Sequence, residues 1–192
     1  MNHQAVILVL CAGLAHGACA TSLAERDLGV WTALIRHGLA PGSRAVVIAD
    51  ETTGDPTALG VKADARTAVV NELGLPPAAF DDWVRRNHSQ DPIAHPLNLD
   101  VSYQVLSAKL RAELFADVAP ALGWQQFNAR FPDANGWVRL SHVGFSDDYR
   151  QALVYLEHQC GAACGTGHLF RLEATTQGDW IVADGLIVWM VK

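Results

Sequence analysis

The chain has few basic residues for its length. Of its 192 residues, 14 are Lys or Arg and 20 are Asp or Glu, so its formal net charge is −6. No cluster of Lys or Arg stands out along the sequence. The chain therefore lacks the basic surface that a phosphate backbone requires, and we expect no nucleic-acid partner.

Motifs of the common catalytic families are also missing. The sequence contains no Gly-x-Ser-x-Gly elbow, no His-Glu-x-x-His, no phosphate-binding glycine loop and no dinucleotide fingerprint. Carboxylates occur in many places, but no pair of them is convincing as an acid and base. We expect no cofactor, and the sequence leaves open whether the protein is an enzyme.

No internal repeat, low-complexity segment or linker divides the chain. Half of the residues are hydrophobic and 18% are charged, which is typical of a globular protein. A chain of this length can bury one sizeable core. We therefore expect a single domain over residues 21–192, with a helical part at about 21–132 and a sheet at about 136–191.

The first 20 residues predict a signal peptide. The apolar run 5–10 is too short to span a bilayer, and Ala18-Cys19-Ala20 offers the small residues that signal peptidase prefers. A mature chain without a transmembrane segment would then lie in the periplasm or outside the cell. Two alternatives remain open: a lipoprotein anchored through Cys19, although His16 does not suit that motif, and a buried N-terminal strand.

Removal of the signal peptide leaves two cysteines, Cys160 and Cys164. Two thiols separated by three residues in an oxidising compartment favour a disulfide across a tight, glycine-rich turn. The alternative is a tetrahedral zinc site formed by these cysteines with His158 and His168. A redox-active disulfide is a third reading, but the sequence has no Cys-x-x-Cys motif.

The N-terminal half predicts amphipathic helices with two short strands. Ser22 and Glu25 have the spacing of a capping box, and Leu28, Trp31, Ile35 and Leu39 follow on one helical stripe. We expect four further helices: one capped by Asp64 and closed by Gly74, and others that begin at Pro77, after Ser107 and at Gly123. Two short strands are expected at residues 45–49 and 101–106. Asp50 and Glu51 follow the first strand, where catalytic and metal-binding carboxylates often lie.

The last third of the chain predicts four strands joined by short links. They cover residues 137–145, 150–158, 167–174 and 180–190. Because short links join antiparallel neighbours, we expect a four-stranded antiparallel meander that the N-terminal helices cover, with one or two short extra strands. The fold class is α+β. Ser141 and His142 fall within the first strand, where neighbours face opposite ways and cannot form a nucleophile and base pair.

The last third also resembles a group of uncharacterised exported bacterial proteins. Their pattern joins an aromatic helix, a Ser-x-Val-Gly-Phe-Ser strand, a Gln-Ala-Leu-Val-Tyr strand, a Cys-Gly-x-x-Cys-Gly-x-Gly loop and a Trp-containing hairpin. The matching residues here are Trp124, Phe127, 141–146, 151–155, 160–167, Trp180 and Trp189. The resemblance implies a bacterial exported domain, with no activity or catalytic residue attached. It also implies a basic residue such as arginine at the position of His142 in the similar proteins.

These observations predict a non-enzymatic binding or accessory domain of the bacterial envelope. Its partner would be an envelope protein or a small ligand that the sequence does not name, and its oligomeric state stays open. The alternative is a small exported enzyme or zinc-binding protein that uses the hairpin from His158 to His168, together with acidic residues such as Asp50 and Glu51.

Overall fold

A computed structural model describes residues 22–38, 45–62, 64–93, 97, 99 and 102–191. The predicted signal peptide, Cys19 and Leu39 lie outside the described residues. Within these ranges, no helix is long and apolar enough to cross a membrane.

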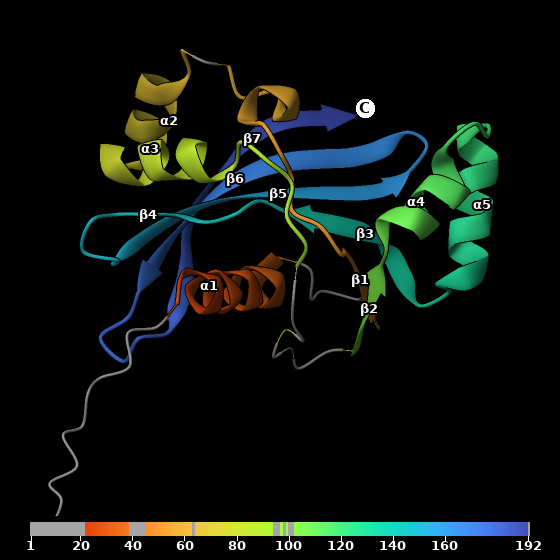
Figure 1. Cartoon of the computed structure of the whole chain (residues 1–192), viewed down its shortest axis with the longest axis horizontal. Coiled ribbons are helices and arrows are strands. Elements are labelled where there is room, and N and C mark those ends of the chain that lie inside the picture. The colour runs from red at the N-terminus through yellow and green to blue at the C-terminus, as the bar shows by residue number, and fades with distance from the viewer. Residues whose placement is uncertain are drawn as a thin grey trace, which may run out of the picture.

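The described chain has five α-helices, one 3-10 helix and seven strands (Figure 1), which confirms the α+β class. The helices are α1 (Leu23–Gly38), η1 (Pro56–Leu59), α2 (Arg66–Leu73), α3 (Pro77–Arg86), α4 (Ala108–Phe115) and α5 (Pro120–Arg130). The strands are β1 (Ala45–Ala49), β2 (Ser102–Leu106), β3 (Ala134–Leu140), β4 (Gly144–Phe145), β5 (Gln151–Gly161), β6 (Cys164–Ala174) and β7 (Trp180–Val191).

All seven strands belong to one mixed sheet, which corrects the predicted four-stranded meander. Its order is β2-β1-β3-β5-β6-β7, and β4 pairs separately with β5. The pairs of β5 and β6 are all antiparallel, as predicted, but β1 lies parallel to both β2 and β3. Each residue of β1 is buried, which suits a strand inside a sheet with both faces covered.

The first strand of the predicted meander is broken into β3 and β4. Both pieces pair with β5, and residues 141–143 between them belong to neither strand, although the Ser141 N–H still donates to the Tyr155 carbonyl of β5 at 2.9 Å. The reason is competition from α3: the Asn87 side chain bonds the backbone N–H and carbonyl of His142, and Arg86 donates to the carbonyl of Val143. At Ser141, the Tyr155 N–H bonds the hydroxyl in place of the carbonyl, which accepts the indole N–H of Trp31. Side chains from α1 and α3 therefore replace part of the regular ladder at this point.

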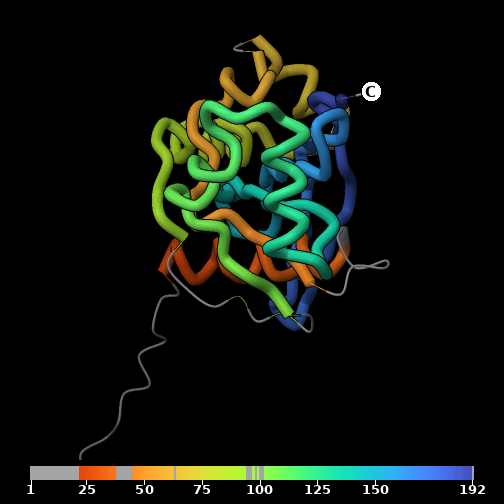
Figure 2. Tube along the Cα trace, turned by 90° about the vertical axis from the view of Figure 1, so that its right-hand side faces the viewer, coloured from red at the N-terminus to blue at the C-terminus, as the bar shows by residue number. Residues whose placement is uncertain are grey.

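Helices cover both faces of the sheet (Figures 1 and 2). Helix α1 lies alone on one face, where Val30 and Leu34 pack against Leu140 and Val154. On the opposite face, α2 and α3 pack over β5 and β6. Beside them, α4 and α5 pack over β1 and β3. The sheet is therefore the middle of three layers.

Several local signals act as predicted. The Ser22 and Glu25 side chains each accept a bond from the other residue's N–H, at 3.2 and 2.7 Å, and the Ser107 hydroxyl accepts a bond from the N–H of Leu110 at 3.1 Å. The predicted cap at Asp64 is wrong, because Ala65 occupies the cap of α2 and makes no side-chain bond there. Helix α5 begins at Pro120 and not at Gly123, since proline suits the first helical turn.

Strand β7 forms one edge of the sheet and is irregular. Ala183 and Val188 are extra residues with no partner of their own in β6. Ala183 lies between the pairs Leu172–Val182 and Arg171–Asp184, and Val188 lies between the pairs His168–Ile187 and Gly167–Trp189. Two β-bulges therefore interrupt a strand of 12 residues.

Candidate functional site

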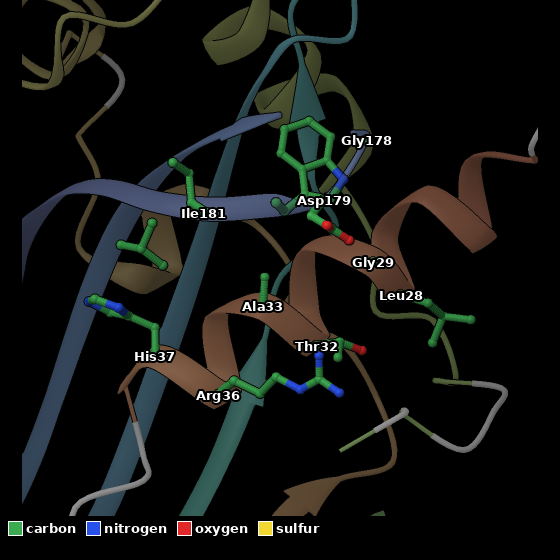
Figure 3. A pocket seen from close by; sticks show the side chains of 11 residues that line it. Leu28, Gly29, Thr32, Ala33, Arg36, His37, Gly178, Asp179 and Ile181 are labelled. Carbon is green, nitrogen blue, oxygen red and sulfur yellow. The ribbon is translucent and has the colours of Figure 1, made fainter. Parts of the chain in front are cut away.

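A groove of about 800 Å³ lies between α1 and the start of β7 (Figure 3). Its lining residues come from one side of the helix and from the turn that leads into the strand. They are Leu28, Gly29, Thr32, Ala33, Arg36, His37, Gly178, Asp179, Trp180, Ile181 and Val182. A cavity of this size can take a small ligand.

Trp180 forms one wall of the groove, and its indole ring packs against Gly29 of α1. A Cβ at Gly29 would lie 3.4 Å from the Trp180 Cδ1 atom, which is an ordinary van der Waals contact. On another side the indole packs against the ring of Phe145, with centroids 5.8 Å apart. The ring is thus held between the helix and the sheet, with one part left as groove wall.

Charged groups of both signs stand around this groove. Figure 3 shows Arg36 and His37 on α1 and Asp179 on the strand side. The two basic side chains belong to the last turn of α1, where the helix dipole favours cations. The arrangement suits binding of a partly apolar ligand with polar ends.

A second concentration of charge, which the sequence analysis missed, lies at the break between β3 and β4, with Asp27 buried and Asp91 exposed at its edge. The Asp27 carboxylate receives a bidentate pair of bonds from Arg86 at 2.9 and 3.0 Å. The His142 ring contacts Asp27 through Nδ1 at 3.1 Å and Asp91 through Nε2 at 2.9 Å. This network, formed by Asp27, Arg86, Asp91 and His142, connects α1, α3 and the loop after α3.

Ser141 and His142 do not form a nucleophile and base pair, although the predicted placement within a strand is wrong. The Ser141 hydroxyl is fully buried and donates to the carbonyl of His142 at 2.7 Å. It also accepts bonds from the indole N–H of Trp83 at 2.9 Å and from the backbone N–H of Tyr155 at 2.8 Å. This hydroxyl therefore holds the chain in place at the break.

Both nitrogens of His142 face carboxylates, which favours the charged form of the ring. The hydrogen bond with Asp27 is the main cause that raises the pKa of His142, and the bond with Asp91 adds to it against the opposing effect of burial. In turn, the bond with His142 lowers the pKa of Asp91. An imidazolium between two carboxylates is an ionic link between elements and not a free base.

Cys160 and Cys164 form a disulfide at the tip of the β5–β6 hairpin, with their Cα atoms 5.0 Å apart. The two histidines of the alternative zinc site lie close enough for the charge of His158 to act on His168, but each has a different partner. His158 Nε2 lies 2.7 Å from the carbonyl oxygen of Asn135, while the His168 ring stacks on Phe170. Burial lowers the pKa of His168. In the described part of the chain, no three His, Cys, Asp or Glu residues lie together as metal ligands.

No protein family model, no curated protein and no solved structure matches the chain. The geometry of the groove and of the buried network is therefore the evidence on which a function can be argued.

Asp50 and Glu51, the acidic residues after β1, hold α4 in place. Asp50 Oδ1 accepts a bond from the N–H of Ala108 at 2.9 Å, at the start of the helix. Glu51 forms an ion pair with Arg111 of the same helix. These contacts account for both carboxylates, and neither has a recorded contact with His158 or His168.

Proposed function

We propose that the mature chain is an exported binding or accessory domain of the bacterial envelope, without enzymatic activity, that holds its ligand in the groove between α1 and β7. The observation that carries this proposal is the groove itself. It combines an indole wall at Trp180 and apolar side chains such as Leu28 and Ile181 with charged groups of both signs. Concave sites that combine apolar and aromatic side chains with a few polar groups are typical of small-ligand binding.

The location in the envelope is supported by the sequence and by the hairpin. The apolar run and small residues of the first 20 positions have the form of a signal peptide. A disulfide such as Cys160–Cys164 persists in oxidising compartments. The resemblance to exported bacterial proteins agrees with both.

The alternative reading, an exported enzyme or zinc protein that uses the hairpin from His158 to His168, is less well supported. Zinc ligation needs both cysteines as thiolates, whereas here the two sulfurs are bonded to each other. The best-placed imidazole for chemistry, His142, is held between two carboxylates. We therefore keep binding as the main proposal.

The groove can be tested with 1-anilinonaphthalene-8-sulfonate, a fluorescent probe that has aromatic rings and one negative charge. We expect saturable fluorescence enhancement with the wild-type protein. Ala33→Trp should weaken binding at least about tenfold, because Ala33 lines the groove and an indole there would fill it. Ala24→Trp is the matched control, since Ala24 is exposed on the same helix and does not line the groove.

Equal binding by Ala33→Trp and the wild type would refute the groove as the binding site. A thermal melt of each variant shows whether the fold is kept, so that loss of binding is not confused with unfolding. Export is tested separately by the intact mass of the protein from the periplasm or medium of an expressing bacterium. We expect a chain that begins at Thr21 and carries an oxidised Cys160–Cys164 pair, whereas an added acyl mass on Cys19 would show a lipoprotein.

A further inference from the structure

The outer edge of β7 is open along the α1–β7 groove. Strand β7 is the last in the sheet order, and within the described part of the chain it pairs with β6 alone. Its first three residues, 180–182, pair with β6 in regular register, and all three also line the groove. The groove therefore runs beside a strand edge that has no partner strand among the described residues.

The backbone groups of Trp180 and Val182 point out of this edge. Ala174, which pairs with Trp180, donates its N–H to the carbonyl of Arg150 on the β5 side at 2.9 Å. Its backbone groups thus face away from β7, and the N–H and carbonyl of Trp180 face away from β6 in the same pair. The direction repeats at every second residue, so the groups of Val182 also face outward. Outside the strand ladders, no described backbone group bonds to either residue.

The side chains of the same two residues face α1. Trp180 and Val182 pack against the core cluster that contains α1, while Ile181 between them is 52% exposed on the other face. Residues that lie opposite each other in paired strands have their side chains on the same face of the sheet. A strand added here would therefore direct every second side chain into the groove, beside Leu28 and Ala33. One added strand would satisfy the open backbone groups and fill the groove together.

Residues 180–182 carry no protection against such an addition. Edge strands are commonly guarded by charged side chains, prolines or bulges. These three residues include no charge and no proline, and the first bulge comes only at Ala183. The regular edge therefore suits a short added segment, and it ends before a long strand could pair.

The charges at the two ends of the groove give the added segment a direction. Figure 3 shows Asp179 beside Gly29. Arg36 and His37 lie about two turns further along α1. Strand β7 runs from Asp179 toward this basic end, as the position of Ile181 shows. An antiparallel segment would begin at the basic end, where an acidic residue fits, and finish beside Asp179, where a basic residue fits.

We propose that the groove binds an extended segment of another protein chain, which adds to β7 as a short antiparallel strand. The inference rests on the proposed function, because it names the ligand class of the same groove. The segment has an acidic residue, two apolar residues separated by one residue, and then a basic residue. Backbone bonds to Trp180 and Val182 supply affinity, and the apolar side chains in the groove supply specificity.

The probe is the peptide acetyl-Glu-Val-Thr-Val-Lys-amide, and the readout is the backbone N–H signals of the full mature chain in proton–nitrogen NMR spectra. We expect saturable downfield shifts for Trp180 and Val182, because each N–H gains an acceptor. The shift of Ile181 should be smaller, since its N–H already faces β6. Ala33→Trp, which fills the groove, should abolish these shifts, and Ala24→Trp should keep them.

Two methylated peptides test the backbone bonds directly. A methyl group on the nitrogen of the first valine removes a donor that faces β7, and it should weaken binding at least about tenfold. The same methyl group on the threonine nitrogen, which faces away from β7, is the matched control and should change the affinity much less. Equal binding of the two methylated peptides would show that side chains alone are recognised, which overturns the strand addition.

Failure of this inference can be told apart from failure of the proposed function. Binding of 1-anilinonaphthalene-8-sulfonate without any peptide shift would refute the added strand and leave the groove as a site for small ligands. Absence of both would refute the two proposals together. Shifts of the Trp180 and Val182 signals that depend on protein concentration in the absence of peptide would show that a second copy of this chain occupies the edge, which also overturns the inference.

Discussion

The strongest single test of the buried network is replacement of Asp27 by alanine. Asp27 is 1% exposed and accepts two bonds from Arg86 and one from His142. In the Asp27→Ala variant, Arg86 keeps its bond to the Val143 carbonyl but loses its counter-charge. Its side chain is only 12% exposed, so water replaces the carboxylate poorly.

The expected loss in the free energy of unfolding is about 3–5 kcal/mol, the usual cost when one partner of a buried ion pair is removed. A domain of this size is stable by about 5–15 kcal/mol, so the variant should lose a large share of its stability. Arg86→Ala alone should also destabilise the protein. The double variant should lose less than the sum of the two single variants, because the pair then has no unpaired member.

The assay is urea unfolding followed by tryptophan fluorescence at neutral pH. Trp31 and Trp83 both donate to Ser141 beside the network, so their emission reports on this region. The matched control is Asp81→Ala, which breaks an exposed bidentate pair with Arg66 on the surface of α2 and α3. Its loss should be much smaller, since solvent screens exposed charges.

If Asp27→Ala loses no more stability than Asp81→Ala, the network does not stabilise the fold as we argue. Additive losses in the double variant would likewise show that Asp27 and Arg86 act separately. A change in the slope of unfolding against urea would indicate an altered denatured or native state, and the comparison would then be made by calorimetry.

Three further predictions follow from the geometry. The raised pKa of His142 means that the charged ring stabilises the fold fully below pH 6.5 and less as pH rises through the raised pKa. The difference in unfolding free energy between wild type and His142→Gln should therefore shrink from about pH 5 to about pH 9. A constant difference in urea midpoints would contradict the ionic link. Replacement of Cys160 and Cys164 by serine should cost only about 2 kcal/mol, since the bond closes a ring with a sequence separation of 4, and a loss of folding in calorimetry would show a larger role. Gly167→Ala should destabilise by about 1–3 kcal/mol, because a Cβ there would overlap the Tyr155 hydroxyl, and an unchanged melting temperature would show that the site can adjust.

Sequence reasoning succeeded where the signal is local. The strand at 45–49 agrees with β1 residue by residue, since it is a short β-branched run between polar neighbours. The capping bonds of Ser22 and Ser107 also form, because cap and partner lie three residues apart. The hairpins of β5, β6 and β7 follow from short links between strands.

It failed where distant segments decide the structure. The break at residues 141–143 depends on Arg86 and Asn87, which lie more than 50 residues earlier in the chain. The contact between Asp27 and His142 joins residues separated by 115 positions. The parallel pairing of β1 depends in the same way on β2 and β3, and no local pattern specifies it. One signal could have pointed to the network. The resemblance implies a basic residue at position 142, and a charged His142 ring between two carboxylates would carry the same charge as that residue.

The irregular edge strand has a consequence for growth of the sheet. Strand β7 has a single charged residue, Asp184, and exposes Ile181, Ile187 and Met190. A regular strand with this composition would invite another chain to add to it and extend the sheet from molecule to molecule. The bulges at Ala183 and Val188 break the even spacing of the backbone donors and acceptors that such an added strand would need. The protein can therefore keep an apolar edge open to its surroundings without acting as a template for fibres.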